Sequence, residues 1–276
     1  MILVDAHQHF WDPAVAEYPW LAHDGLAPVR RRFYPDDLEP VVREHGVGGT
    51  VLVQALGSPA ETRRLLDLAE ATPFVLGVVG WIDLTDPDAA GALARLAGGT
   101  LVGIRHQVHD EPDPAWLLRP DVQRGIAAVG EAGLAYDLLV RPAELPAAIE
   151  TARRQPGMRF VVDHVAKPPL RGGDAGEWAR GLEQLAALQN VSCKLSGLVV
   201  EADWGAWRAE ELVPYYRRAL EWFGPERCLF GSDWPLCLVS ADYAAVLELV
   251  RAALAELGET ERAAVLGGNA MRLYRL

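Results

Sequence analysis

The 276-residue sequence contains few cysteines, and none is placed for pairing. Cys193, Cys228 and Cys237 are an odd number and show no Cys-x-x-Cys spacing. This disfavours both a disulfide framework and a structural zinc knuckle. Cys193 and Cys228 lie inside apolar runs, so we expect them to be small buried packing residues.

Positive charge is also scarce. Lys and Arg number 26 against 38 Asp and Glu, which gives a formal net charge of −12. We therefore expect no broad basic patch, and neither a nucleic acid nor an anionic membrane surface as a partner. The first apolar run breaks at Asp5, and no run approaches the length of about 18 residues that a membrane span needs. We expect a cytoplasmic protein without a signal peptide.

Glycine-rich phosphate loops are missing as well, since the sequence contains neither GxGxxG nor GxxxxGK[ST]. What is present is an alternation of apolar, β-prone runs with helical patterns. Strands are expected from Ile2 and at residues 49–54, 74–81, 101–104, 135–140, 160–162, 191–195 and 228–230. Helices are expected at residues 35–45, 59–71, 87–96, 122–132, 142–155, 175–188, 210–223, 241–257 and 259–266, followed by a tail.

Strict alternation of this kind implies a parallel sheet. Eight units in this length fit a (β/α)8 TIM barrel, and half of the residues are hydrophobic, enough for a large core. A doubly wound open sheet is the main alternative, but it would be expected to carry a glycine-rich phosphate turn. We predict an α/β fold with eight parallel strands in a single barrel domain that spans residues 1–276.

The polar residues at the start of the chain suggest chemistry. His7 and His9 follow an apolar run, and side chains two residues apart in a strand point to the same side. Two imidazoles on one side can hold a metal ion or bracket a reacting water. The alternative is a pair of ordinary histidines that leave the strand for solvent. The loop of residues 12–32 that follows either lines a pocket with Trp11, Tyr18 and Trp20 or is pinned down by these aromatic residues.

Polar residues also follow the other predicted strands. In a barrel the active site lies at the carboxyl ends of the strands, so these side chains are expected to converge. They are His7, His9, Gln54, Trp81, Asp83, Arg105, His106, Asp137, Asp163, His164, Lys167, Lys194, Ser196, Asp233 and Trp234. Burying so many polar groups without a function would be costly.

Each of these residues also has a structural explanation. Asp163 and Asp233 could cap the helices or loops that follow them, and Lys194 could extend its amine out of the barrel mouth. Arg105 could pair with an acid for structural reasons alone. His109 is better explained as an ordinary satisfied histidine. For His164 and Asp233 the active-site interpretation is favoured, because barrel geometry brings them towards His7 and His9.

Several blocks in a fixed order resemble the amidohydrolase superfamily of metal-dependent hydrolases, in the branch called amidohydrolase 2. Within this branch the chain is most similar to the sugar-lactone hydrolases of the L-fuconolactonase type. The blocks cover nearly the whole chain and are DAHQHFW at residues 5–11, GWIDL at 80–84, GIRH at 103–106, VDHVAKP at 162–168, SCKLSG at 192–197, FGSDWP at 230–235 and GNA at 268–270. The resemblance implies a (β/α)8 barrel that hydrolyses a small lactone or ester.

The resemblance also implies that His7, His9, His164 and Asp233 correspond to site positions of the superfamily. The chain departs from the common pattern on its fifth strand, where Tyr136 and Asp137 stand in place of a histidine ligand. The fourth strand offers no obvious carbamylated lysine or bridging glutamate. A two-metal centre is therefore not expected. A single zinc or manganese ion on His7, His9 and Asp233, with His164 as a further ligand, is one outcome, and a metal-free site is the other.

Lactone opening requires an activated water, a partner for the oxyanion and a proton for the leaving alkoxide. We expect Asp233 to be the base. A metal ion, Arg105 or Lys194 would meet the oxyanion, and His164 or His106 would protonate the alkoxide. The side chains expected to bind the sugar are Trp11, Trp81, Trp234, Gln54, Asp83 and Asp137.

Two other functions remain open at this point. A related branch of the superfamily uses similar residues for non-oxidative decarboxylation, and a carbohydrate-binding barrel without catalysis would need the same pocket. The particular lactone, its ring size and the oligomeric state do not follow from the sequence.

Overall fold

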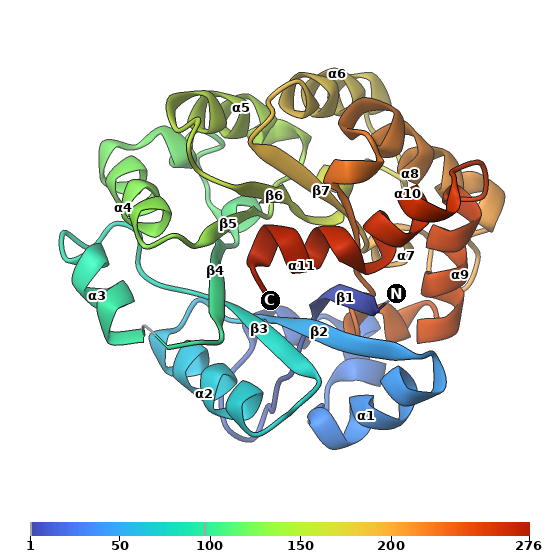
Figure 1. The fold of residues 1–276 in the computed structure, drawn as a ribbon, viewed down its shortest axis with the longest axis horizontal. Coiled ribbons are helices and arrows are strands. Elements are labelled where there is room, and N and C mark those ends of the chain that lie inside the picture. Colours follow the sequence, from blue (N-terminus) through green and yellow to red (C-terminus); the bar gives the residue numbers. More distant parts are fainter. Residues whose placement is uncertain (1, 97) are drawn as a thin grey trace.

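The computed structural model describes residues 2–96 and 98–276. Its centre is a single sheet of eight parallel strands in the order β1 to β8 (Figure 1). The strands are β1 Leu3–Gln8, β2 Val47–Val53, β3 Val75–Gly80, β4 Leu101–His106, β5 Ala135–Leu138, β6 Phe160–Val162, β7 Val191–Leu195 and β8 Cys228–Phe230. The predicted single-domain TIM barrel is confirmed.

Helices surround the sheet, as the alternation predicted (Figure 1). They are α1 Pro35–Glu44, α2 Pro59–Glu70, α3 Ala89–Leu96, α4 Pro120–Glu131, α5 Leu145–Arg154, α6 Ala175–Ala186, α7 Leu198–Glu201, α8 Ala209–Phe223, α9 Tyr243–Ala253, α10 Glu259–Ala263 and α11 Asn269–Tyr274. Two predictions differ from the structure. The loop of residues 12–32 contains the 3-10 helices Pro19–Ala22 and Asp24–Val29, and the predicted tail is the helix α11.

Backbone hydrogen bonds at the seam between β8 and β1 close the barrel. The other neighbouring strands pair by parallel ladders, with register shifts between β1 and β2, β2 and β3, and β3 and β4, whereas an isolated bridge joins Gln8 of β1 to Trp234 just after β8. The Asp233 N–H donates to the His7 carbonyl at 2.8 Å, and the His9 N–H donates to the Trp234 carbonyl at 2.7 Å. The seam therefore brings the residues after β8 directly against His7 and His9.

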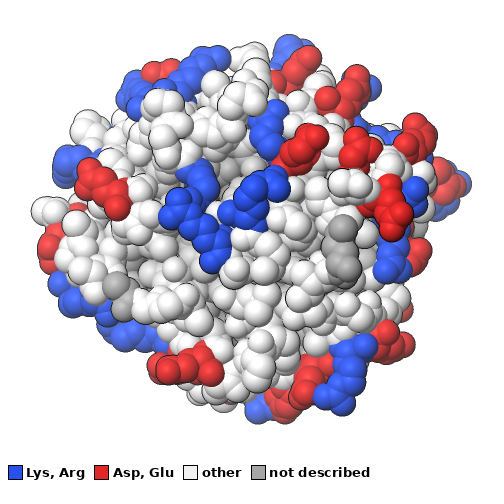
Figure 2. Space-filling model, in the orientation of Figure 1, with Lys and Arg blue, Asp and Glu red and all other residues white. Residues whose placement is uncertain are grey.

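The helix α11 lies across the end of the barrel where the strands begin (Figure 1). Ala270 and Tyr274 pack with the inward-facing apolar residues of the strands, among them Val4, Val51 and Val161. This helix therefore closes the floor of the barrel, and the carboxyl ends of the strands open on the opposite side. Figure 2 shows the floor, with charged side chains of both signs spread around its margin and several basic ones nearer its middle.

The three cysteines are unpaired and fully buried, which confirms the packing role predicted for Cys193 and Cys228. Among the described residues, no helix has the length and apolar character needed to cross a membrane.

Candidate active site

A cavity of about 360 Å³ opens at the carboxyl ends of the strands. His9, Arg105, His164 and Asp233 line it, and the 3-10 helices after β1 add further residues to its wall. This is the position that the barrel fold predicts for an active site.

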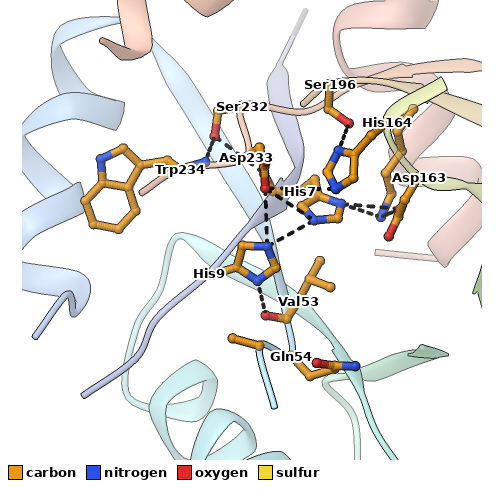
Figure 3. Close-up of polar contacts among 12 residues, drawn as sticks. His7, His9, Val53, Gln54, Asp163, His164, Ser196, Ser232, Asp233 and Trp234 are labelled. Carbon is orange, nitrogen blue, oxygen red and sulfur yellow. Dashed lines mark hydrogen bonds and ion pairs between the residues drawn. The ribbon is translucent and has the colours of Figure 1, made fainter. Parts of the chain in front are cut away.

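His7 and His9 face Asp233 across the seam (Figure 3). The Nε2 atoms of the two histidines are 3.1 Å apart, and Asp233 Oδ1 lies 3.4 Å from His9 Nε2 and 3.8 Å from His7 Nε2. His9 Nδ1 is 2.7 Å from the carbonyl oxygen of Val53, which can only accept. Nδ1 therefore carries a proton, and Nε2 faces His7 Nε2 and Asp233 Oδ1.

Asp233 is buried but ionised. Burial raises the pKa of its carboxyl group, but the neighbouring His164, His7 and His9 lower this pKa by more than burial raises it. The pKa of Asp233 therefore lies below its usual range. Among the described residues, its buried Oδ1 has no hydrogen-bond partner. The site therefore presents a buried anionic oxygen that is free to accept a hydrogen bond or to bind a cation.

His164 approaches Asp233 from the turn after β6. Its Nε2 lies 4.0 Å from Asp233 Oδ1, and its Nδ1 lies 2.9 Å from the hydroxyl oxygen of Ser196 (Figure 3). Burial lowers the pKa of His164 to about 4, although Asp233 and Asp163 act in the opposite direction. The imidazole is therefore neutral at pH 7.

Unusual backbone conformations hold these two residues in place. His164 and Asp233 have φ angles of 52° and 58°, in the left-handed region that costs L residues about 1–3 kcal/mol each. Gly197, with a φ of 72°, leaves room for the His164 ring, and a Cβ at this position would overlap it. Residues in strained conformations of this kind cluster at functional sites, because the surrounding fold compensates for their cost.

Arg105 reaches the cluster from β4. Its Nη1 lies 2.9 Å from Asp163 Oδ2 and 3.2 Å from His7 Nε2, and its Nη2 donates to the carbonyl oxygen of Gln54. The guanidinium is almost fully buried but remains on the cavity wall. Burial raises the pKa of Asp163, but the charges of Lys194, His7 and Arg105 lower it to well below its usual range. Asp163 is thus the permanent counter-charge of Arg105.

Lys194 and Asp137 lie below the cavity, inside the barrel. Lys194 Nζ contacts Asp137 Oδ2 at 2.5 Å, and both side chains are fully buried. Neither side chain belongs to the cavity wall among the described residues. The structure therefore does not place Asp137 or Lys194 on the described part of the cavity wall, and the same holds for the fully buried His7, which Lys194 contacts.

The predicted sugar-binding residues differ in their positions. Trp11 lines the cavity and packs edge-to-face on Trp20, with ring centroids 5.1 Å apart. Gln54 is fully buried behind the wall, where its side chain bonds Gln107, which does line the cavity. Tyr18 is nearly buried and bonds Arg64 rather than lining the cavity.

Like His7, Gln54, Asp137 and Lys194, four further predicted residues are absent from the cavity wall among the described residues. Trp81 donates to His106 at 3.0 Å, and the His106 ring stacks on Trp116. His106 also contacts Glu111 at 2.7 Å, so its ring is held outside the cavity. The two others are Asp83, which accepts hydrogen bonds from Thr85 in an exposed turn, and Trp234, whose indole points away from the cluster towards Phe10 and Phe33 (Figure 3).

The cavity wall also contains residues that the sequence did not single out. The wall residues that were not predicted there include His23, Leu26, Gln107, His109, Asp110, Arg141, Arg171 and Trp204, whereas Trp20 and Lys167 were expected at the site and do line the cavity. Four cations and two carboxylates line this cavity in a protein with a net charge of −12. The position of Arg141 shortly after β5 was the available signal, since residues at strand ends face the barrel mouth.

The cluster fits a divalent metal ion. His7, His164 and Asp233 offer ligand atoms that all lie within 4.8 Å of one another, and His9 Nε2 lies beside them. Imidazole nitrogens and carboxylate oxygens are the ligands of zinc, and the buried Asp233 Oδ1 has no hydrogen-bond partner among the described residues. Arg105 places a fixed cation beside the same cluster.

Three histidines and an aspartate lie together at the carboxyl ends of the strands of a TIM barrel. This fold and this site define an enzyme of the TIM-barrel class. More specifically, the chain belongs to the amidohydrolase family, whose family model matches residues 4–276.

Curated proteins of known activity resemble the chain over its full length. It is 42% identical to an L-fucono-1,5-lactonase of Burkholderia ambifaria, over 99% of this chain and 95% of the relative. It is 40% identical to an L-fucono-1,5-lactonase of Burkholderia multivorans, over 99% of this chain and 96% of the relative. A crystal structure of an amidohydrolase from Burkholderia multivorans with bound zinc superposes with a TM-score of 0.96 at 39% identity, over all of both chains.

Proposed function

We propose that the protein is a lactonase that hydrolyses a small sugar-acid lactone of the L-fucono-1,5-lactone type. The observation that carries this proposal is the cluster of His7, His9, His164 and Asp233, of which His9, His164 and Asp233 line the cavity at the carboxyl ends of the strands. The identity of 40–42% with two L-fucono-1,5-lactonases supports the choice of a lactone over other substrates.

The cavity suits one sugar ring. Its volume of about 360 Å³ lies near the lower end of the range for small-molecule sites. Trp11 and Trp20 add apolar rings to its wall, and Gln107, Arg141 and Lys167 add polar groups. A polyhydroxylated ring needs both kinds of surface.

Asp233 acts as the base in this proposal. Its ionised Oδ1 accepts a hydrogen bond from the attacking water and takes its proton as the water bonds to the lactone carbonyl carbon. The Arg105 guanidinium on the same wall stabilises the oxyanion that forms, a contribution of roughly 3 kcal/mol for a well-placed donor. Collapse of the tetrahedral intermediate then breaks the bond between the carbonyl carbon and the ring oxygen.

The leaving alkoxide needs the proton that Asp233 has taken. His164 is better placed to transfer it than His106, because His164 lines the cavity 4.0 Å from Asp233 whereas His106 is held outside it. The product is a hydroxy acid, which ionises to a carboxylate near neutral pH. Arg141 and Lys167 then face this carboxylate from the outer wall.

A zinc or manganese ion would be held by His7, His9 and Asp233, with His164 as a further ligand. When bound, such an ion supplies Lewis-acid polarisation of a carbonyl oxygen or a water.

The test is a hydrolysis assay of a panel of aldonolactones in a pH-stat, on protein purified without chelator and assayed with and without EDTA. We expect acid release from 1,5-lactones of 6-deoxy sugars without evolution of carbon dioxide. Carbon dioxide release from a carboxylic acid substrate would instead identify a decarboxylase. Lactone binding in calorimetry without acid release would identify a binding protein.

A further inference from the structure

Three buried polar side chains connect the floor of the barrel with His7. The Tyr274 hydroxyl in α11 lies 2.9 Å and 2.8 Å from the two carboxylate oxygens of Asp137. Asp137 Oδ2 lies 2.5 Å from Lys194 Nζ, and Lys194 Nζ lies 3.1 Å from His7 Nδ1. All four side chains are buried, and none of Tyr274, Asp137 and Lys194 is among the described residues of the cavity wall.

This arrangement is unusual for a barrel interior. The neighbouring inward-facing residues, such as Val51, Val79 and Val161, are apolar, and a buried ammonium group is costly even when it is paired. Because none of the three lines the cavity among the described residues, direct contact with a substrate does not account for them. They are connected with the site through Lys194, which contacts both His7 and Asp163.

The contacts of Lys194 fix one edge of the His7 ring. The ammonium group is within hydrogen-bond distance of Asp137 Oδ2 at 2.5 Å and His7 Nδ1 at 3.1 Å, and it forms an ion pair with Asp163 Oδ1 at 3.0 Å. Asp163 Oδ1 also lies 3.3 Å from His7 Nδ1. With the Nδ1 edge held in this way, the Nε2 edge of the ring is turned towards His9 and Asp233.

Tyr274 controls this arrangement through Asp137. Its hydroxyl lies almost equally far from both carboxylate oxygens, so it fixes the plane of the carboxylate and keeps Oδ2 aimed at Lys194. Without the hydroxyl the carboxylate can rotate, Lys194 can shift towards Asp163, and the His7 ring loses its support. We propose that Tyr274 is a positioning residue, by which the C-terminal helix α11 sets the orientation of His7 through Asp137 and Lys194.

This inference deepens the proposed function, since it assumes that His7 belongs to the working site. The test compares Y274F with Y136F in the otherwise intact protein. Tyr136 is a matched control, because it is fully buried in the neighbouring barrel wall and its hydroxyl has no hydrogen-bond partner among the described residues. Two measurements are made on each variant: steady-state lactone hydrolysis, and the 15N resonances of the His7 ring in metal-free protein.

In Y274F we expect kcat to fall about tenfold, the usual effect of removing a group that orients a site residue, while KM stays within about twofold. We also expect the His7 resonances of Y274F to move, and both readouts of Y136F to match the wild type. D137N should act in the same direction as Y274F and serves as the second variant if Y274F does not fold.

Unchanged His7 resonances in the folded variant overturn the inference, even if Y274F is less stable than the wild type, because that result leaves Tyr274 with a purely structural role. Movement of the resonances in a protein that hydrolyses no lactone supports the inference and contradicts the proposed function, so the two failures are distinguishable.

Discussion

Burial determines the protonation state of His164. Its pKa falls to about 4, whereas the pKa of Asp233 stays below its usual range because of the neighbouring histidines. At neutral pH the site therefore contains an ionised carboxylate beside a neutral imidazole. A carboxylate base and a proton-transferring imidazole need this combination of charges.

The lowered pKa of His164 predicts a pH dependence of stability. Between pH 6.5 and about 4 the unfolded chain binds a proton at His164 that the folded chain does not. The free energy of unfolding is therefore not reduced by His164 above pH 6.5. Below this pH it falls by about 1.4 kcal/mol per pH unit until the pH reaches about 4. We expect H164Q to lack this part of the slope in urea unfolding at pH 4.5 to 6.5. An identical slope in wild type and H164Q would contradict the assignment.

At the scale of elements, the turns after the strands determine the site. The four residues 164–167 after β6 and Asp233 after β8 all have positive φ angles, and Gly197 after β7 has a φ of 72°. Together these turns aim His164 and Asp233 at the residues of β1 across the seam. The barrel thus determines where the site lies, and the turn conformations determine how His164 and Asp233 are oriented in it.

Gly197 allows a direct test of this point. G197A should lower the free energy of unfolding by about 1–2 kcal/mol, the cost of a left-handed L residue, and should also displace the His164 ring. We expect lactone hydrolysis to fall at least tenfold. Gly205 is the matched control, since it has a φ of 76° and a Cβ there would meet nothing within 4 Å. G205A should lose similar stability and keep its activity, and equal activity of the two variants would refute the role of the turn.

The sequence was sufficient to predict which strands meet but not how deep each side chain lies. His7, His9, His164 and Asp233 could be placed together because parallel strand ends share one rim of a barrel. The same rule put Asp137 and Lys194 on that rim, although they are fully buried, pair with each other and are absent from the cavity wall among the described residues. Side-chain depth depends on the register and tilt of the strands, which periodicity does not reveal.

Contacts between segments far apart in the chain could not be predicted from the sequence either. Tyr274 was part of a predicted tail, and only the packing of α11 against the barrel floor brings it to Asp137. Trp81 and Asp83 match the strand-end pattern but turn into contacts with His106 and Thr85 in the loops that follow. Local sequence does not record these loop conformations, because they depend on long-range packing.

At the scale of the whole molecule, the cavity and the remaining surface differ in charge. The protein carries a net charge of −12, yet the cavity wall contains Arg105, Arg141, Lys167 and Arg171 against two carboxylates. Arg105, Lys167 and Arg171 are paired with Asp163, Glu201 and Asp203, so Arg141 is the wall cation that has no ion pair among the described residues and can attract an anion. The acid formed by lactone opening is such an anion.

The charge of the cavity predicts product inhibition that depends on Arg141. Arg141 is exposed at the rim, and it forms no ion pair with another described residue. We expect R141Q to weaken inhibition by the aldonate product by up to about fivefold, equivalent to about 1 kcal/mol for an exposed ion pair. R153Q, on the exposed part of α5, is the control and should leave the inhibition constant unchanged. Equal inhibition constants for the wild type and R141Q would show that the product does not contact this side chain.

The most direct measurement compares the hydrolysis of L-fucono-1,5-lactone by wild type, D233N and D110N in a pH-stat, with folding verified by circular dichroism. D110N removes a carboxylate from the same cavity wall and leaves His7, His9, His164 and Asp233 in place. We predict that kcat falls by about 10² to 10⁴ in D233N and changes little in D110N, because only Asp233 activates the water. Near-normal hydrolysis by folded D233N would contradict the account, since no base would then be needed at the seam of the barrel.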